Sequence, residues 1–173
     1  MATSVLLLLG DDYEDLELQY PRLRLLEAGY WPVTAALAAG HTYRGKHGYP
    51  CVSDRAIGDL EAEPFAGIVI PGGWMPDKLR RDGKVLELVR QMDKAGKCIA
   101  SICHGGWICI SAGIVEGVQY TGSLGIKDDL VNAGAHFVDQ AVVVDGHHIS
   151  SRKPDDLPAF MTATLERLAQ QAR

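Results

Sequence analysis

The chain lacks several features that would assign it to a functional class at once. It has no excess of positive charge, because 17 Lys and Arg residues stand against 22 Asp and Glu residues and leave a net charge of −5. We therefore expect no nucleic-acid partner. Its apolar runs, such as Val5 to Leu9, have the length of strands and are far too short to span a membrane. The N-terminus shows no signal-peptide pattern, so a cytoplasmic protein is expected.

Cysteine is also scarce. The four Cys residues show no C-x-x-C spacing and no accompanying histidine cluster of the zinc-binding kind, and the six His residues show no metal-ligand spacing. A cytoplasmic chain rarely holds its cysteines as disulfides, so we expect free thiols and no metal site. Cys51, Cys98 and Cys109 are interpreted as packing residues, which leaves Cys103 as the thiol of interest.

Strands and helices alternate along the 173 residues, a length that suits one domain. Continuously apolar strands are expected at 4–9, 31–37 and 65–70, and another ends at Ile102. Helices are expected from Leu16 up to a stop at Gly29, and at 85–92, 105–112, 127–133 and 157–168. A loop or hairpin at 41–50, a short strand at 119–121 and a hairpin of 142–144 with 148–150 complete the pattern. This alternation predicts an α/β fold with a mostly parallel sheet.

The first predicted helix contains an irregularity. Leu16, Tyr20, Leu23 and Leu26 recur at helical spacing. Pro21 lies inside this run, and its missing N–H is expected to kink the helix or to start a fresh turn.

Three loops rich in polar residues or glycine directly follow predicted strands: Gly10–Glu17, Pro71–Asp77 and Cys103–Trp107. In open parallel sheets, ligands bind at the carboxyl ends of the strands. We therefore expect these three loops to meet at one edge of the sheet and to form the functional site.

The elbow, residues 102–105, is the strongest signal. A buried-type strand ends at Cys103, and His104, two glycines and a helical pattern follow at once. A thiol in such a turn lies near backbone N–H groups that favour the thiolate, which is the nucleophilic form. His104 could serve as its partner, since thiol–imidazole pairs are a common route to activation. The simpler alternative is a buried cysteine that merely ends a core strand.

The other two loops offer supporting chemistry. Five acidic residues follow the first strand, and one carboxyl that turned toward the thiol would hold its proton at neutral pH and could relay it to a substrate. Gly72 and Gly73 could expose N–H groups that, with the N–H of His104, stabilise an oxyanion. The alternatives are a solvated acidic loop and a plain turn.

These residues also carry a family resemblance. Five segments match in order: Tyr-Glu-Asp-Leu-Glu at 13–17 with Pro21, Pro-Gly-Gly at 71–73 with Pro76, Ala-Ser-Ile-Cys-His-Gly at 100–105, Ile-Lys-Asp-Asp at 126–129 with Asn-Ala-Gly at 132–134, and Val-Val-Val-Asp-Gly at 142–146 with Ser-Ser-Arg at 150–152. Along nearly its full length the chain resembles the intracellular protease PfpI group of the ThiJ/PfpI superfamily. Proline, common after the His-Gly pair, is replaced by Gly106, and an active-site aromatic of some members by Ser123.

The resemblance implies a flavodoxin-like three-layer sandwich, with residues 1–173 as one ThiJ/PfpI domain of the class I glutamine amidotransferase-like kind. By motif position, Cys103 would be the nucleophile, His104 its partner and Glu14 the carboxyl hydrogen-bonded to the thiol. Gly73 and the His104 backbone would form the oxyanion site, with Gly72 and Gly105 in the same substrate-binding turns. Asp77 would complete a triad in a neighbouring subunit of a homodimer or homohexamer.

Three functions are compatible with these residues. The first is a stress-protection enzyme of the glyoxalase III or deglycase kind, in which Cys103 adds to a reactive carbonyl without any cofactor and Glu14 or His104 moves the proton. The second is a cysteine peptidase that uses Cys103, His104 and Asp77 of the neighbouring subunit. The third is a redox sensor or chaperone, in which oxidation of Cys103 is the signal.

Overall fold

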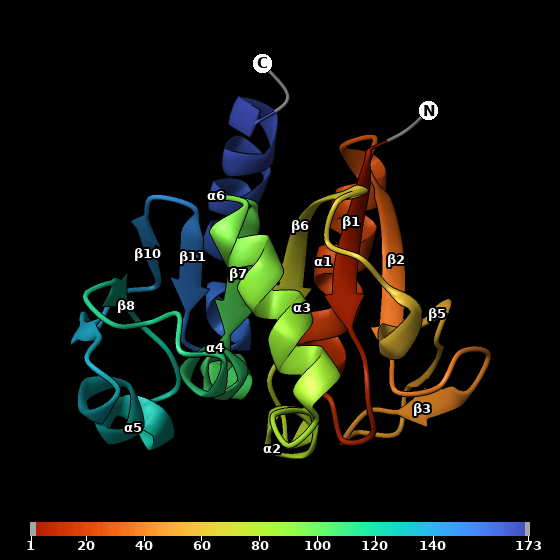
Figure 1. The fold of residues 1–173 in the computed structure, drawn as a ribbon, viewed down its shortest axis with the longest axis horizontal. Coiled ribbons are helices and arrows are strands. Elements are labelled where there is room, and N and C mark those ends of the chain that lie inside the picture. Colours follow the sequence, from red (N-terminus) through yellow and green to blue (C-terminus); the bar gives the residue numbers. More distant parts are fainter. Residues whose placement is uncertain (1–2, 172–173) are drawn as a thin grey trace.

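The computed structural model describes residues 3–171 and is built around a seven-stranded sheet (Figure 1). The strand order is β10-β11-β7-β6-β1-β2-β5. Every pairing is parallel except that of β10 with β11. The strands are β1 (Ser4–Leu8), β2 (Trp31–Ala36), β5 (Arg55–Ala56), β6 (Phe65–Ile70), β7 (Cys98–Ile102), β10 (Val142–Asp145) and β11 (His148–Ser151).

Helices cover both faces of this sheet. On one face, α1 (Asp15–Glu27) packs against α6 (Leu157–Gln171). On the other face, α3 (Gly83–Lys94) packs against α4 (Gly106–Ala112), and Figure 1 shows α3 crossing in front of the strands. The short helices α2 (Met75–Leu79) and α5 (Lys127–Asn132) both pack against α4. The predicted three-layer α/β sandwich is confirmed.

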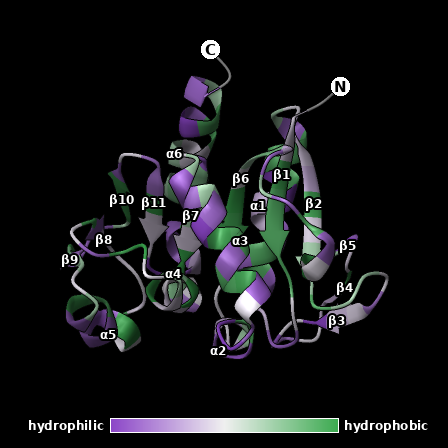
Figure 2. Ribbon diagram, viewed as in Figure 1, coloured by the Kyte–Doolittle hydropathy of each residue, from purple (hydrophilic) through white to green (hydrophobic). Residues whose placement is uncertain are grey.

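The core lies between the sheet and its two helical layers. Leu6, Leu7 and Leu8 of β1 are fully buried, and Figure 2 shows β1 and β6 as continuously hydrophobic ribbons. Strands covered on both faces carry apolar residues on both sides, which explains why the sequence shows runs rather than alternation. Within residues 3–171, no helix is both long and apolar enough to cross a membrane.

Two small sheets lie outside the central one. The segment 41–50 belongs to a hairpin of β3 (Thr42–Arg44) and β4 (Pro50–Val52), as predicted. The strand predicted at 119–121 is β8 (Gln119–Tyr120), which pairs with β9 (His136–Phe137) rather than with the main sheet. The sequence missed α2, because five residues that begin next to Pro76 carry too little periodicity to be recognised as a helix.

Helix α1 differs from expectation in two ways. It continues through Pro21 as one helix, so the fresh turn expected there is wrong. The side chains that it buries include Glu17, Leu18 and Leu25, whereas the leucines of the periodic apolar pattern are largely exposed. The face of α1 turned toward the sheet therefore carries a carboxyl group.

Candidate active site

The elbow is a strained turn between β7 and α4. Cys103 has a φ of 60°, and one turn of 3-10 helix over Cys103–Gly105 leads from the strand into α4. A non-glycine residue in this region costs of order 1–3 kcal/mol and persists only where its surroundings enforce it. Cys103 is half-buried, so its sulfur combines a fixed direction with access from outside.

Glycines let the loops after β6 and β7 approach each other closely. A Cβ placed on Gly72 would lie 2.8 Å from Cys103 Cβ, and one on Gly105 would lie 2.3 Å from the carbonyl oxygen of Ile70. Gly73 has a φ of 78° and forms a bridge with Tyr13 of the loop after β1. The predicted convergence of the three loops at the carboxyl ends of β1, β6 and β7 is therefore present.

Glu17 provides the carboxyl group that faces the thiol. Its side chain is fully buried, and Oε2 accepts the N–H of Gly72 at 2.7 Å. Oε1 is buried without a hydrogen bond of good geometry from residues 3–171, and Cys103 approaches this carboxyl. Burial raises the pKa of Glu17 to about 7, and the charge of Glu14 adds to the effect. A carboxyl titrating near neutrality beside a thiol can both take and return a proton.

Glu14, which was expected to bond the thiol, lies elsewhere. It is the N-cap of α1: Oε2 accepts the N–H of Glu17 at 2.9 Å, and Oε1 lies 3.8 Å from His47 Nε2. An N-cap side chain folds back over the first turn of its helix, whereas the residue three positions later projects from the helix face. Because that face of α1 meets the sheet edge, the place next to the sulfur belongs to Glu17, and the sequence-based assignment to Glu14 is corrected.

The groups around the sulfur of Cys103 have opposite effects on its pKa. Burial, followed by the charge of Glu17, raises the pKa of Cys103 to about 12, while the N–H groups of His104 and Gly73 lower it. When Glu17 holds a proton, its charge is absent and its O–H can bond to the sulfur, so the thiolate becomes accessible. The protonation of Glu17 and the ionisation of Cys103 therefore depend on each other.

His104 completes the polar set. Its Nδ1 lies 3.1 Å from Cys103 Sγ. Burial, and then the charge of Lys46, lower the pKa of His104, so the imidazole is neutral at pH 7. Its ring centroid lies 5.5 Å from that of Trp74 and 4.9 Å from that of Trp107. Sequence reasoning missed Lys46 and Trp74, and no spacing signal links either residue to the elbow.

Comparisons with known proteins agree with this geometry. Residues 3–167 match the model of the DJ-1/PfpI family. The chain belongs to this family. It is 45% identical over 164 residues to a deglycase of Pyrococcus abyssi, covering 95% of this chain and 98% of that protein. It is 38% identical over 170 residues to protein/nucleic acid deglycase 2 of Escherichia coli, covering 97% of this chain and 99% of that protein.

A solved structure is similar as well. The DJ-1/ThiJ/PfpI-like domain of a two-domain protein from Anabaena variabilis, which also contains a ferritin-like domain, superimposes with a TM-score of 0.95 at 38% identity. The match covers 96% of this chain and 48% of that one, so this chain spans about half the length of the Anabaena protein.

The glycines of this DJ-1/PfpI site have different tasks. The N–H groups of Gly73 and His104 point to the sulfur and are the donors available to a developing oxyanion. The N–H of Gly72 is already bonded to Glu17, so Gly72 positions the carboxyl instead. Gly105 has no room for a side chain and permits the close packing of the elbow on β6.

Asp77 lies on α2 with an exposed carboxylate. It forms an ion pair with Arg81 one turn later, with 2.6 Å between the carboxylate oxygen and Nη2. Among residues 3–171 the structure gives Asp77 no contact with His104, and its role in a neighbouring subunit stays a prediction.

The two departures from the family pattern both lie at this site. Gly106 begins α4 in the absence of the usual proline, and a Cβ there would lie 3.1 Å from Ile126 Cδ1. Ser123 donates its N–H to the carbonyl oxygen of Cys103 at 3.2 Å, and its Oγ accepts the N–H of Gly125. Ser123 thus supports the elbow backbone.

The remaining cysteines are distant from this chemistry. The four thiols of the chain are free, with Cys98 and Cys109 buried in the core and Cys51 half-buried on β4. Cys98 and Cys109 are 1% and 0% exposed, so no substrate can reach either sulfur.

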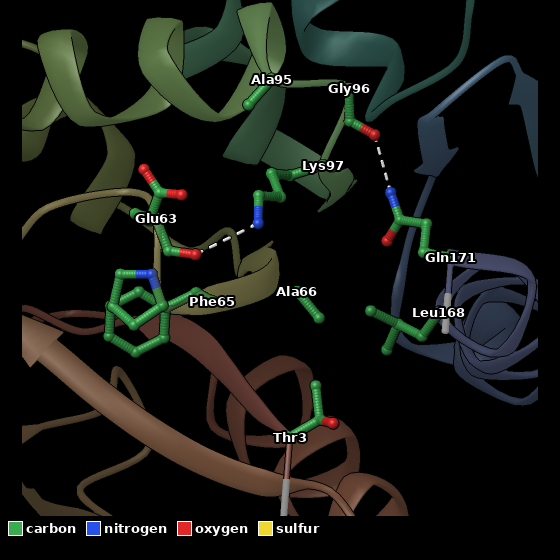
Figure 3. A pocket seen from close by; sticks show the side chains of 10 residues that line it. Thr3, Glu63, Phe65, Ala66, Ala95, Gly96, Lys97, Leu168 and Gln171 are labelled. Atoms are coloured by element: carbon green, nitrogen blue, oxygen red, sulfur yellow. Dashed lines mark hydrogen bonds between the residues drawn. The ribbon is translucent and has the colours of Figure 1, made fainter. Parts of the chain in front are cut away.

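A cavity of about 410 Å³ lies at the opposite end of the sheet (Figure 3). Its lining includes Phe65, Leu168 and Lys97, whose Nζ donates to the carbonyl oxygen of Glu63 at 3.2 Å. Among residues 3–171 its lining includes no thiol and no histidine, so its size does not mark it as the reactive centre.

Proposed function

We propose that this protein is a cysteine-dependent stress-protection enzyme that acts on reactive 2-oxoaldehydes and on their adducts with amines, in the cytoplasm and without a cofactor. The observation that carries the proposal is the pair of Cys103, on a strained and accessible turn, with Glu17, a buried carboxyl whose pKa is raised to about 7. Two relatives at 45% and 38% identity are named deglycases, which supports the choice of substrate class.

The sulfur of Cys103 would react as follows with methylglyoxal. The thiolate forms a C–S bond to the aldehyde carbon, and the oxygen takes the proton that Glu17 holds, which gives a hemithioacetal. Glu17 then removes the proton from that carbon and, through an enediol, a proton returns to the neighbouring carbon. The product is a lactoyl thioester of Cys103. Carbon 1 is oxidised and carbon 2 is reduced, so no external redox partner is needed.

Water completes the reaction. His104, neutral at pH 7, would take a proton from the attacking water, and the N–H groups of Gly73 and His104 would stabilise the oxyanion. The C–S bond breaks, and lactate and the thiol are released. The overall reaction converts methylglyoxal and water to lactate.

An adduct of methylglyoxal with an amine would reach the same hemithioacetal by a different first step. The thiolate displaces the amine from the carbinol carbon, and Glu17 protonates the leaving nitrogen. The resulting hemithioacetal is the same, so the adduct plus water gives the free amine and lactate. One site therefore accounts for both glyoxalase and deglycase activity.

The decisive experiment compares wild type with Cys103→Ser, and uses Cys51→Ser as the matched control. Lactate is quantified with methylglyoxal and with a methylglyoxal-treated arginine derivative. We expect Cys103→Ser to lose at least about 10³-fold in kcat/KM on both substrates, because removal of a nucleophile has effects of this size or larger. Cys51→Ser should retain wild-type rates. Lactate formation that survives in Cys103→Ser would contradict the mechanism.

A cysteine peptidase is the alternative that one observation favours. The 3.1 Å contact between Cys103 Sγ and His104 Nδ1 is the nucleophile–base arrangement that acyl transfer requires. The same variants are therefore assayed with a fluorogenic peptide. Peptide cleavage that needs Cys103, with no turnover of either carbonyl substrate, would replace the first proposal by this one.

The proposal includes a homodimer or a homohexamer. On α1, Leu16 and Leu23 are exposed to 58% and 59%, and Leu26 lies on the same surface. An apolar stripe on a surface helix supports contact with a second copy of the chain. In such an assembly Asp77 of the neighbour could approach His104, as the family pattern implies.

A further inference from the structure

A second cluster of chemically capable side chains lies far from the elbow, at the amino ends of β7 and β11. It consists of Asp93 near the end of α3, His147 in the β10–β11 turn and His148 at the start of β11. Asp93 Oδ1 lies 2.8 Å from His147 Nε2 and 2.9 Å from His148 Nε2. Two imidazole nitrogens and one carboxylate oxygen therefore converge on one point.

Both histidines face Asp93 through Nε2. In a metal-free cluster each Nε2 would need to carry a proton for Asp93 to accept. Only 6% of the surface of His148 is exposed, yet its Nδ1 has no hydrogen-bond partner within the described part of the chain. In the metal-free cluster Asp93 holds a proton on Nε2 of His148, and no partner on Nδ1 opposes the move of that proton to Nδ1, which lets Nε2 present a lone pair to a metal.

The donor set indicates which ions would fit. Two imidazoles with one carboxylate suit borderline divalent metals such as Zn²⁺, Co²⁺ and Ni²⁺, whereas Mg²⁺ and Ca²⁺ prefer oxygen ligands throughout. Zinc bonds of 2.0–2.1 Å in a tetrahedral site require ligand atoms about 3.3 Å apart. The pairs at 2.8 and 2.9 Å would open by about half an ångström, which side-chain rotation can supply.

We propose that Asp93, His147 and His148 bind one divalent transition-metal ion of the Zn²⁺, Co²⁺ or Ni²⁺ class. A water molecule occupies the fourth position, since Asp93 and His147 are exposed to 27% and 25% and leave the site open on that side. The metal joins the end of α3 to the β10–β11 hairpin across 54 positions of sequence. It stabilises the fold at the end of the sheet opposite Cys103 and takes no part in the carbonyl chemistry.

The affinity should be moderate. A metal-bound histidine normally donates its second ring N–H to a carbonyl or carboxylate, and the loss of such support weakens binding about 10–100-fold. His148 Nδ1 lacks that support from residues 3–171. We therefore expect binding that is measurable by calorimetry and reversed by a chelator.

The test uses the full-length Cys103→Ser protein as the parent, because the thiol at the elbow is itself a metal ligand. Zn²⁺ is titrated into the parent and into His147→Gln and Asp93→Asn made in it, with binding followed by calorimetry and thermal unfolding. His47→Gln is the matched control, since Glu14, Asp15 and His47 form the other cluster of potential ligands found within residues 3–171. Circular dichroism and gel filtration verify that each variant is folded.

We expect one Zn²⁺ per parent chain, a rise in its unfolding temperature, and at least a tenfold weaker affinity in His147→Gln and in Asp93→Asn, with His47→Gln unchanged. Co²⁺ bound to the parent should show visible absorption without a sulfur charge-transfer band. The proposal is overturned if the parent binds no metal, or if binding is lost in His47→Gln and kept in the other two variants. It is equally overturned if both Asp93→Asn and His147→Gln, correctly folded, bind as the parent does.

Discussion

The two ends of the central sheet are built in contrasting ways. At the carboxyl end, three loops are pressed together so closely that Gly72 and Gly105 have no room for a side chain, and Cys103 is held at a φ of 60°. At the amino end, ordinary side chains surround a cavity of about 410 Å³ (Figure 3). The contrast shows that the reactivity of Cys103 depends on the close approach of backbone N–H groups and a carboxyl group to its thiol, and not on the volume of a cavity.

The difference has an energetic meaning. A strained residue and a buried carboxyl group both oppose folding, and they persist only where the rest of the molecule enforces them. Such features are concentrated at the carboxyl end. The four predictions below test whether the two ends differ as much in energy and activity as they do in geometry.

The largest effect is expected for Glu17→Gln, which keeps the shape of the side chain and removes its proton transfer. We expect kcat/KM for methylglyoxal to fall by about 10²–10⁴-fold, the usual contribution of a general acid–base group. In wild type, kcat/KM should rise with pH through about 7, because Cys103 and Glu17 together need to lose one proton and the pKa of Glu17 is raised to about 7. This ionisation should be missing from the pH profile of the variant.

The matched control is Glu14→Gln, three residues earlier on the same helix. It alters the N-cap of α1 and should reduce stability by about 1 kcal/mol or less, with kcat/KM close to wild type. An equal loss of activity in Glu14→Gln and Glu17→Gln would contradict the assignment of the inward carboxyl group.

Glu17→Gln also changes the pH dependence of stability. The pKa of Glu17 rises from 4.5 to about 7 on folding, so the native state binds the proton more tightly and wild-type stability falls as pH rises between these values. The decline corresponds to about 3 kcal/mol at 1.36 kcal/mol per unit. Denaturant unfolding at pH 5 and pH 8 should show a smaller decline in Glu17→Gln, and an unchanged decline would argue against a buried, protonatable Glu17.

An intermediate effect is expected for Gly73→Ala. The φ of 78° and a Cβ only 2.3 Å from the carbonyl oxygen of Asp12 should together lower the free energy of unfolding by about 2–3 kcal/mol. Gly113→Ala is the control, because Gly113 has a similar φ of 74° and nothing within 4 Å of the new Cβ. It should lose about 1 kcal/mol. Equal losses, measured by urea unfolding, would mean that close packing at the site adds nothing.

The smallest effect is expected for Lys97→Met at the cavity of the amino end. The substitution removes one partly exposed hydrogen bond to the carbonyl oxygen of Glu63, so stability should change by no more than about 0.5 kcal/mol and kcat/KM should stay at the wild-type level. A large loss of activity in Lys97→Met, measured with methylglyoxal, would contradict the conclusion that only the carboxyl end of the sheet contributes to catalysis.

Much of the fold could be predicted from local patterns. The buried strands, the β10–β11 hairpin and the order of strands and helices followed from apolar runs, turn residues and glycine stops. Two features were not predicted. Helix α2 is too short to show a period, and the pairing of β8 with β9 depends on tertiary packing that no local pattern records.

The residues of the candidate site could also be predicted in part. The sequence identified Cys103, His104 and the glycine turn, since each is marked by its neighbours in the chain. It identified Glu14 instead of Glu17, although the exposed Leu16 and Leu23 show that the apolar period of α1 lies on its outer face. The sequence also gave no sign of Asp93 beside His147 and His148, because 54 residues separate them.

The sequence by itself determined the elbow: a strand that must end at Cys103, a turn that needs glycines and a helix that must follow. These are local properties, governed by the conformational preferences of neighbouring residues. Only the tertiary structure decided which carboxyl group reaches the sulfur, which N–H groups point to it and which aromatic rings border it. Those choices depend on how α1 is rotated against the sheet and how closely the three loops approach, and both result from packing across the whole domain.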